Sequence, residues 1–302
     1  MVFTKKIKVK NKEYWVLVHS IRKGSKIIQK KKYIGKVLPP KMRLEQLKKE
    51  FLKELTIGRY KFISNKDVEE IEKKKFEYIK ELKKMSSSEK KEKLQEFNIR
   101  FTYDSSKLAG VDVTLRQTSL ILKEGIMPKG FKSLKIAKEL ENHEKVLIAI
   151  TKYKGKLDIK FLKKIHKILL SGVDDSIAGK LRGELKRDVK IAGTSYIPPK
   201  WDQVNKELES FFKWYSSENR RMHTLELASL IHLKLISIQP FIDGNSRLSR
   251  LLMNWILWKK SYPLIDIPVK DIEDYYNVLD KYQIEKKEKP FVDYIKKKYL
   301  ND

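Results

Sequence analysis

Residues 239–250 read Gln-Pro-Phe-Ile-Asp-Gly-Asn-Ser-Arg-Leu-Ser-Arg, and the interpretation of the chain starts from this stretch. Pro240 and Gly244 interrupt regular structure, so a loop is expected before Asn245. A dense apolar pattern with helical spacing follows over residues 247–257. Gly244 and Asn245 are therefore expected at a helix N-terminus, where free backbone N–H groups and the helix dipole favour a bound anion.

Charged side chains of the same stretch fit a phosphate group. Arg247 and Arg250 are three residues apart, so they lie on one face of the predicted helix. Two guanidinium groups beside a helix start suit phosphate oxygens, and Asp243 could hold a Mg²⁺ ion that bridges phosphates. The alternative is an ordinary Asp-Gly turn with Asn245 as helix cap and two solvated arginines. The Pro-Phe pair and the register of both arginines favour the phosphate site.

The stretch resembles the signature of Fic-domain proteins, His-Pro-Phe-x-Asp-Gly-Asn-Gly-Arg-x-x-Arg. Fic-domain proteins move part of a nucleotide, usually AMP from ATP, onto a protein hydroxyl. The resemblance implies that Asp243 coordinates Mg²⁺ with the phosphates of ATP. It also implies four nucleotide-phosphate ligands, which are Gly244 through its backbone N–H, Asn245 through its amide, Arg247 and Arg250. Ser246 stands where glycine or lysine is usual, and a positive φ there would carry a cost.

Gln239 occupies the position of the family's catalytic histidine. In the family, that histidine accepts the proton of the target hydroxyl as it attacks the α-phosphorus. A glutamine amide can position a hydroxyl by a hydrogen bond but cannot act as a base at neutral pH, and loss of a general base typically lowers a rate by about 10² to 10⁴. We therefore predict an impaired adenylyltransferase or a non-catalytic ATP-binding module. His232 could replace the base, although a buried structural histidine is the favoured interpretation.

Residues 105–110 read Ser-Ser-Lys-Leu-Ala-Gly, with Thr-Leu at 114–115, and they resemble the inhibitory segment of the family, Ser/Thr-x-x-x-Glu-Gly. Ser105, Ala109 and Gly110 occupy its three defining positions. In the family, the glutamate pairs with the second arginine of the signature and blocks seating of the γ-phosphate. Ala109 cannot form that pair, so Arg250 is expected to be free for ATP.

Two further segments resemble parts of the family's site. Residues 187–199 alternate, turn at Gly-Thr and end at two prolines, a pattern that predicts a β-hairpin. The hairpin resembles the family's flap, which holds the backbone of the target protein, and its alternative is an ordinary surface hairpin. Target-docking candidates on it are Ile191, Gly193, Thr194 and Tyr196. Tyr275 and Tyr276 resemble the late tyrosine that contacts adenine.

Composition indicates a globular protein of 302 residues with 41% apolar content. The absence of cysteine excludes disulfides and thiolate metal sites. The sequence shows neither an apolar run of membrane-spanning length nor the apolar region of a signal peptide, so we expect no membrane association and a cytoplasmic location.

The formal net charge of +29 is concentrated toward the N-terminus. Residues 1–40 hold 12 lysines and arginines and one acid, Glu13. Strands are expected over Lys12 to Ser20 and Lys26 to Ile34, with a turn at residues 22–25. Lysines and the aromatic Tyr14, Trp15 and Tyr33 could bind nucleic acid. Alternatively, the aromatic rings pack on the helical body and the lysines are solvated.

The predicted fold class is mainly α, a Fic-type helical bundle with a β-hairpin flap and a small N-terminal β-sheet unit. The predicted divisions are a basic β unit at 1–40, a helical arm at 41–98 and a Fic-like domain at 99–302. Expected ligands are ATP and Mg²⁺, the expected partner is a target protein, and an oligomer is compatible with the sequence. Helices are expected at about 41–56, 64–84, 88–97, 115–125, 131–151, 158–170, 201–217, 222–237, 246–260, 270–284 and 289–299.

Overall fold

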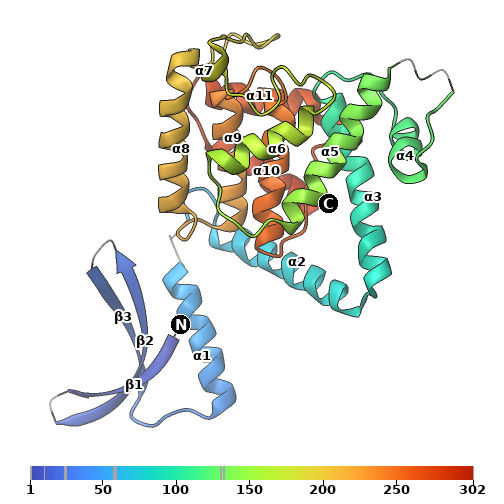
Figure 1. Cartoon of the computed structure of the whole chain (residues 1–302). Coiled ribbons are helices and arrows are strands. Elements are labelled where there is room, and N and C mark those ends of the chain that lie inside the picture. The colour runs from blue at the N-terminus through green and yellow to red at the C-terminus, as the bar shows by residue number, and fades with distance from the viewer. Residues whose placement is uncertain are drawn as a thin grey trace. The chain divides into compact units, whose positions relative to one another are not determined.

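The computed structural model describes residues 2–9, 11–23, 26–56, 60–129, 131 and 133–301. The chain divides into two compact units, residues 1–61 and 62–302, each with its own packing (Figure 1). The boundaries expected near residues 40 and 98 remain predictions.

The first unit is a three-stranded antiparallel sheet followed by one helix. Its elements are β1 (Val2–Val9), β2 (Lys12–Lys23), β3 (Lys26–Gly35) and α1 (Lys41–Thr56), with strand order β1-β2-β3. Val2, Leu17 and Phe51 form the buried core between sheet and helix. Both expected strands are confirmed. The turn predicted at residues 22–25 lies partly outside the described residues.

The second unit is helical. Its longer helices are α2 (Asn65–Lys84), α3 (Ser87–Lys107), α4 (Leu115–Glu124), α5 (Leu134–Lys152), α6 (Ile159–Leu170), α8 (Val204–Glu218), α9 (Thr224–Ile238), α10 (Asn245–Lys259), α11 (Ile272–Gln283) and α12 (Lys289–Asn301). Short turns are α7 (Arg182–Leu185) and the 3-10 helices η1 (Trp201–Gln203) and η2 (Val269–Asp271). The predicted mainly helical fold is confirmed.

Side-chain caps explain where several of these helices begin. Ser64 and Ser86 each accept a hydrogen bond from the third residue of their helix, and the carboxylates of Asp67 and Glu89 bond back to the cap backbone. This reciprocal arrangement satisfies N–H groups that have no partner within the helix. The cap of α3 thus lies in the serine cluster directly before Glu89.

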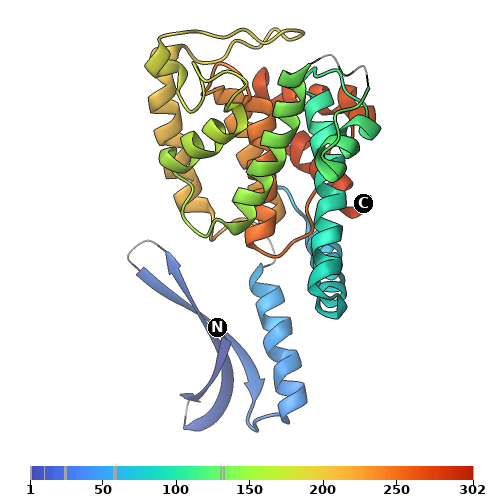
Figure 2. The same cartoon turned by 45° about the vertical axis from the view of Figure 1, so that its right-hand side comes forward.

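Helices α9 and α10 form the centre of the second unit (Figures 1 and 2). Every described residue of α9 except Thr224 and Lys234 is buried, and α10 is buried from Arg247 to Leu257. The two helices pack on each other, while α5 and α6 pack on α10 and α8 and α12 pack on α9. Because its first turn follows the loop at 239–244, α10 places the candidate site next to this buried pair of helices.

Two expectations about local structure differ from the observed fold. Helix α3 continues ten residues beyond the predicted end at 97, so Ser105 lies within a helix. Residues 187–199 turn at Gly193, which has a φ of 81°, but form no strand on either side. Side chains satisfy polar groups near that turn instead, since Tyr196 N–H donates to Thr194 Oγ1 at 3.2 Å.

Among the described residues, no helix combines the length and the apolar content needed to cross a membrane.

Candidate functional site

The loop before α10 ends in a glycine that no other residue could easily replace. Gly244 has a φ of 75°, in the left-handed region, and a Cβ added there would lie 3.3 Å from Leu169 and 3.5 Å from His166. The first bond within the helix runs from Leu248 N–H to Gly244 O at 2.9 Å. The N–H groups of residues 245–247 come before that bond, so the helix start offers donors for an anion.

Asn245 closes the loop instead of reaching outward. Its Oδ1 accepts from Phe241 N–H at 3.0 Å, and its Nδ2 donates to Phe241 O at 2.7 Å. Both ends of the amide are therefore used within the loop, and a contact between this amide and phosphate remains a prediction. Ser246 has no positive φ, so the backbone cost considered for it is absent.

His166 supports the same loop from α6. Its ring stacks on Phe241 with centroids 3.6 Å apart and planes 5° apart. Gly179 N–H donates to Nδ1 at 2.9 Å, so Nε2 carries the ring proton and donates to Asp243 O at 3.0 Å. Burial lowers the pKa of His166 to about 4, and the ring is neutral at pH 7. No pattern in the sequence singles out this histidine.

Arg182 holds the other end of the loop. Its guanidinium is fully buried and donates to the backbone oxygens of Gln239 at 2.6 Å, Pro199 at 2.8 Å and Ile238 at 3.3 Å. Its backbone N–H donates to Pro240 O at 2.9 Å. Arg182 thus connects the start of the signature to the end of the segment 187–199. The guanidinium has five N–H donors in a fixed geometry, so it can bond to several backbone oxygens at once.

Gln239 ends α9 in the left-handed conformation, with φ 49° and ψ 60°. Its side-chain Nε2 donates to Ile236 O at 2.7 Å, a bond within its own helix end. The residue lines the cleft described below. The backbone of Gln239 therefore has a defined left-handed conformation at the cleft, while its side chain bonds to the last turn of α9.

Arg247 lies between two carboxylates. It donates to Glu139 of α5 at 2.8 Å and to Asp243 at 3.1 Å, and its Nε is buried without a partner in the described structure. Its side chain is only 5% exposed, whereas that of Asp243 is 61% exposed. Asp243 also accepts the N–H of Gly244 at 2.5 Å. Glu139, which sequence reasoning missed, thus anchors the arginine from a distant helix.

Arg250 is fully buried and is not free, contrary to the expectation drawn from Ala109. Its Nε donates to Ser105 Oγ at 3.0 Å and its Nη2 to Ser105 O at 2.6 Å, while Nη1 donates to Ser246 Oγ at 2.5 Å and to Tyr275 Oη at 3.3 Å. Ser105 therefore accepts hydrogen bonds from the arginine that, in the family, pairs with the glutamate at the position of Ala109. A phosphate contact for Arg250 remains a prediction.

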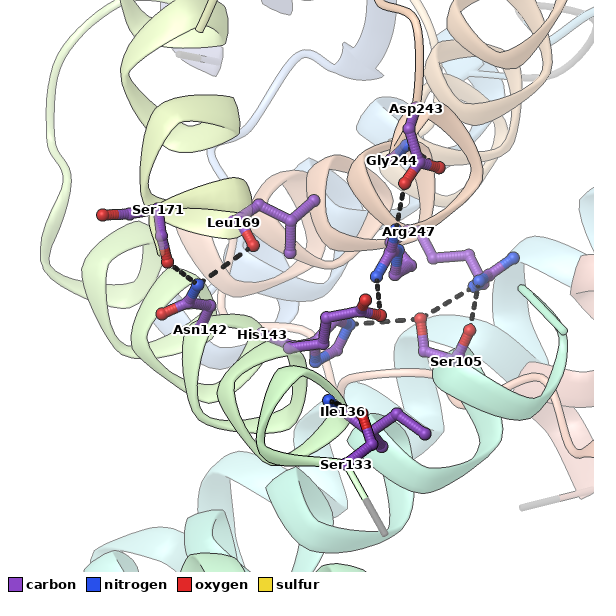
Figure 3. A network of polar contacts seen from close by, with 12 residues as sticks. Ser105, Ser133, Ile136, Asn142, His143, Leu169, Ser171, Asp243, Gly244 and Arg247 are labelled. Carbon is purple, nitrogen blue, oxygen red and sulfur yellow. Dashed lines mark hydrogen bonds and ion pairs between the residues drawn. The ribbon is translucent and has the colours of Figure 1, made fainter. Parts of the chain in front are cut away.

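A hydrogen-bond chain continues from Ser105 into α5 (Figure 3). Ser105 Oγ lies 3.1 Å from His143 Nε2, and Thr102 Oγ1 lies 2.9 Å from His143 Nδ1. Because Thr102 already donates to Asn98, His143 Nδ1–H donates to Thr102 and Nε2 accepts from Ser105. Complete burial and the nearby Arg250 and Arg247 lower the pKa of His143 well below its usual value, which agrees with a neutral ring.

A cleft of about 620 Å³ brings four segments of the sequence together. It is lined by the end of α9 with the loop and the first turn of α10, by residues 108–110 after α3, by the turn at residues 190–194 and by one side of α11. The predicted site residues that line it are Ala109, Gly110, Ile191, Gly193, Thr194, Gln239, Asp243, Gly244, Asn245, Arg247 and Tyr276. Ser105, Tyr196, Arg250 and Tyr275 do not line it.

Similarity to known proteins agrees with this arrangement. A family model for the Fic/DOC family matches residues 156–257, which include α6, the signature loop and most of α10. The chain contains a Fic/DOC-family domain. The chain is 33% identical over 204 residues to the protein adenylyltransferase Fic of Drosophila ananassae, an alignment that covers 64% of this chain and 38% of that protein. It thus spans less than half the length of this curated relative.

Solved structures share the fold of the Fic domain. A Fic domain containing signaling protein from Bacteroides thetaiotaomicron aligns with a TM-score of 0.68 and 26% identity, over 76% of this chain and 92% of that one. A fragment of Fic-1 from C. elegans aligns with a TM-score of 0.66 and 22% identity, over 87% of this chain and 75% of that one, and shows the fold alone.

The two tyrosines proposed for adenine have different positions in the Fic domain. Tyr276 is 43% exposed at the cleft, and its hydroxyl donates to Leu108 O at 2.7 Å. Tyr275 is fully buried, with its hydroxyl 3.0 Å from His232 Nε2. His232 itself is fully buried and stacks on Phe291 at 4.8 Å, so the structural interpretation of this histidine holds.

Two side chains that follow the turn at Gly193 fasten the segment 187–199 to neighbouring helices. Thr194 Oγ1 donates to Asp280 of α11 at 2.7 Å, which holds the turn beside the cleft. Tyr196 Oη donates to Ser237 O at 2.7 Å, and burial raises the pKa of this hydroxyl to about 12. Ile191 and Gly193 lie at the cleft, whereas Tyr196 faces a neighbouring pocket beside α8.

Proposed function

We propose that the cleft of the Fic domain binds Mg²⁺·ATP and supports transfer of AMP to a hydroxyl of a target protein, at a rate limited by Gln239. The observation that carries this proposal is the convergence of the signature loop, Ala109 and the turn at Gly193 on one cleft. The helix start at residues 245–247 offers backbone donors, and Arg247 offers charge beside them.

Asp243 fits the requirement for the metal. The described residues contain no group of three or more histidine or acidic side chains placed to hold an ion, and Asp243 is the carboxylate that the signature loop brings to the cleft. Mg²⁺ in nucleotide sites is commonly held by one or two carboxylates together with phosphates and water. Asp243 is exposed, and among the described residues its carboxylate accepts from Gly244 and Arg247, which leaves lone pairs available. When bound, the metal would neutralise phosphate charge.

The transfer would form one bond and break one. The hydroxyl oxygen of the target attacks the α-phosphorus of ATP, the bond from the α-phosphorus to the bridging oxygen breaks, and pyrophosphate leaves with its electron pair. The hydroxyl proton must pass to a base. Gln239 offers only a hydrogen bond to that hydroxyl, and His232 is buried away from the cleft. We therefore infer that the proton passes to water, which makes the step slow.

Gln239→His should restore transfer. Histidine is among the residues that tolerate the left-handed backbone found at position 239, so the substitution introduces a base without new strain. The protein is incubated with Mg²⁺, α-³²P-labelled ATP and a protein acceptor, including itself. We expect at least about 10²-fold more labelled protein than with the unchanged chain.

Gln239→Asn is the matched control, since asparagine also tolerates this backbone and cannot act as a base. Equal labelling by all three proteins would contradict the proposed role of position 239. No labelling by any of them, together with ATP binding, would instead identify a non-catalytic ATP-binding module.

Asp243→Asn should weaken Mg²⁺·ATP much more than ATP alone. The substitution removes the carboxylate charge at an exposed position, so the fold should tolerate it. Isothermal titration with ATP, with and without Mg²⁺, measures the difference, which we expect to be at least about tenfold in Kd, or ~1.4 kcal/mol. Asp202→Asn, at another exposed position of the Fic domain, serves as control. A similar loss in both variants would remove Asp243 from the proposed metal site.

Target docking at the cleft edge is part of the proposal. Ile191 and Gly193 lie beside Gln239 at the cleft, and the segment that carries them forms no strand within the protein. Among the described residues, the backbone groups of Ile191 and Gly193 have no backbone partner, so they can pair with an extended segment of a target protein.

A further inference from the structure

The sheet of the N-terminal unit has two faces, and α1 covers only one of them (Figure 1). Leu17 of β2 belongs to the core that packs on α1. Successive residues of a strand point to opposite faces, and residues paired across strands share a face. Val16 and Val18 therefore point to the other face, which we call the open face.

The open face carries three aromatic rings and three lysines. Phe3 pairs with Val18, Lys5 and Tyr33 pair with Val16, and Lys31 pairs with Val18. Tyr14 and Lys12 lie on the same face because they alternate with Trp15 and Glu13.

Two of the three rings on the open face are exposed in the structure. Phe3 is 43% exposed and Tyr33 is 57% exposed, while Val16 and Val18 between them are buried at 3% and 0%. The rings of Tyr14 and Tyr33 contact edge to face, with centroids 5.3 Å apart. The accessible surface of this face is therefore made by the side chains around the two valines, among them the exposed rings of Phe3 and Tyr33.

The charge of the open face has one sign. Glu13, the only acid within residues 1–40, alternates to the α1 side of the sheet and forms an ion pair with Lys6. Lys5, Lys12 and Lys31 are exposed on the open face, and the described part of that face contains no acid. A ligand that matches this surface carries repeated negative charge and flat apolar groups.

We propose that the open face binds a single strand of nucleic acid, with unpaired bases stacked on Tyr33 and Phe3 and with phosphates beside Lys5, Lys12 and Lys31. Exposed rings on a sheet, flanked by lysines, are the arrangement that recognises unpaired bases. In a duplex the flat surfaces of the bases are hidden. A lipid surface would instead select an amphipathic helix with apolar side chains along one face.

The test measures fluorescence anisotropy of a labelled twelve-nucleotide oligothymidylate with the full-length chain and no ATP. Tyr33→Leu keeps an apolar side chain at an exposed position and removes the ring, so the fold is retained, which circular dichroism verifies. We expect affinity to fall about 5- to 100-fold, the range for loss of one base–aromatic stack. Phe76→Leu, at a ring that is 68% exposed on α2, should leave affinity unchanged.

Salt dependence tests the lysines separately. Each phosphate contact to a single strand contributes about 0.7 to the slope of log Kd against log salt. Lys31→Ala should lower that slope by about 0.7, whereas Lys49→Ala, at an exposed lysine of α1, should leave it unchanged.

Three results would overturn the proposal. The first is equal affinity for the single strand and for a duplex of the same length. The second is equal affinity of the Tyr33→Leu and Phe76→Leu variants. The third is displacement of the single strand by vesicles of anionic lipid as effectively as by unlabelled oligonucleotide, which would indicate a membrane surface. None of these outcomes bears on the proposed ATP cleft, which lies in residues 62–302.

Discussion

Ser105 illustrates how much a single buried residue contributes to the site. Its hydroxyl accepts from Arg250 and contacts His143, and its carbonyl accepts from Arg250 again. The serine therefore orients an arginine of the signature from 145 positions away in the sequence. Removing the hydroxyl would leave Arg250 Nε and His143 Nε2 buried without this partner. An unsatisfied buried polar group costs more than the net gain of an ordinary hydrogen bond.

Ser105→Ala should lower the free energy of unfolding by about 1–3 kcal/mol. Urea unfolding followed by circular dichroism measures the change. Ser106→Ala is the control, because this neighbouring serine is equally buried but is not among the partners of Arg250, which are Ser105, Ser246 and Tyr275. If both variants lose the same stability, the contact between Ser105 and Arg250 contributes nothing beyond the burial of a hydroxyl.

At the scale of elements, the end of α3 meets the start of α10. Leu108, which follows the last residue of α3, accepts from Tyr276 of α11, and Ala109 lies exposed at the cleft. A side chain at position 109 therefore extends toward the space proposed for phosphates. The small methyl group of Ala109 leaves this space open. The guanidinium of Arg250, however, already donates hydrogen bonds to Ser105.

Ala109→Glu should weaken ATP binding by about tenfold or more, because a carboxylate would face the triphosphate in a partly enclosed cleft. Isothermal titration measures the affinity. Ala109→Gln has nearly the same size without the charge and should change affinity less. An unchanged affinity in Ala109→Glu would mean that nucleotide phosphates do not approach this end of α3.

At the scale of the whole molecule, three buried histidines link stability to pH. Burial lowers the pKa of His166 to about 4 and the pKa values of His143 and His232 well below their usual value. All three are neutral in the folded protein, whereas the unfolded chain protonates them below about pH 6.5. Their contribution to the free energy of unfolding is fully present above that pH and is lost as the pH falls. Asp266 acts in the opposite direction, because burial and Asp104 raise its pKa.

His166→Asn isolates one of these contributions. Between about pH 6.5 and pH 4, the free energy of unfolding of the wild-type protein should fall by up to ~1.4 kcal/mol per pH unit more than that of the variant. The reason is that the wild-type chain takes up one more proton on unfolding, at His166. Urea unfolding at several pH values gives both slopes. Parallel slopes would mean that His166 is protonated in the folded protein, in conflict with its bond from Gly179 N–H.

The sequence predicted the order and type of the helices because the signals for them are local. Caps such as Ser86 with Glu89 act across three residues, and apolar periodicity acts within one helix. The two strands expected around Gly193 did not form, because a local signal is not enough for a strand. Alternation there was local, but a strand also needs a partner, and the polar groups near the turn bond to side chains instead.

The signature at residues 239–250 was sufficient to locate the loop, the helix start and the missing base, since each of these follows from residues next to one another in the chain. Which side chains hold the site was decided by the tertiary structure. His166 beneath the loop, Arg182 at its start and Glu139 on Arg247 lie 57 to 108 positions from their partners. Partners at such separations are chosen by how helices pack, because a buried donor or acceptor must be satisfied by whatever group the packing brings within reach.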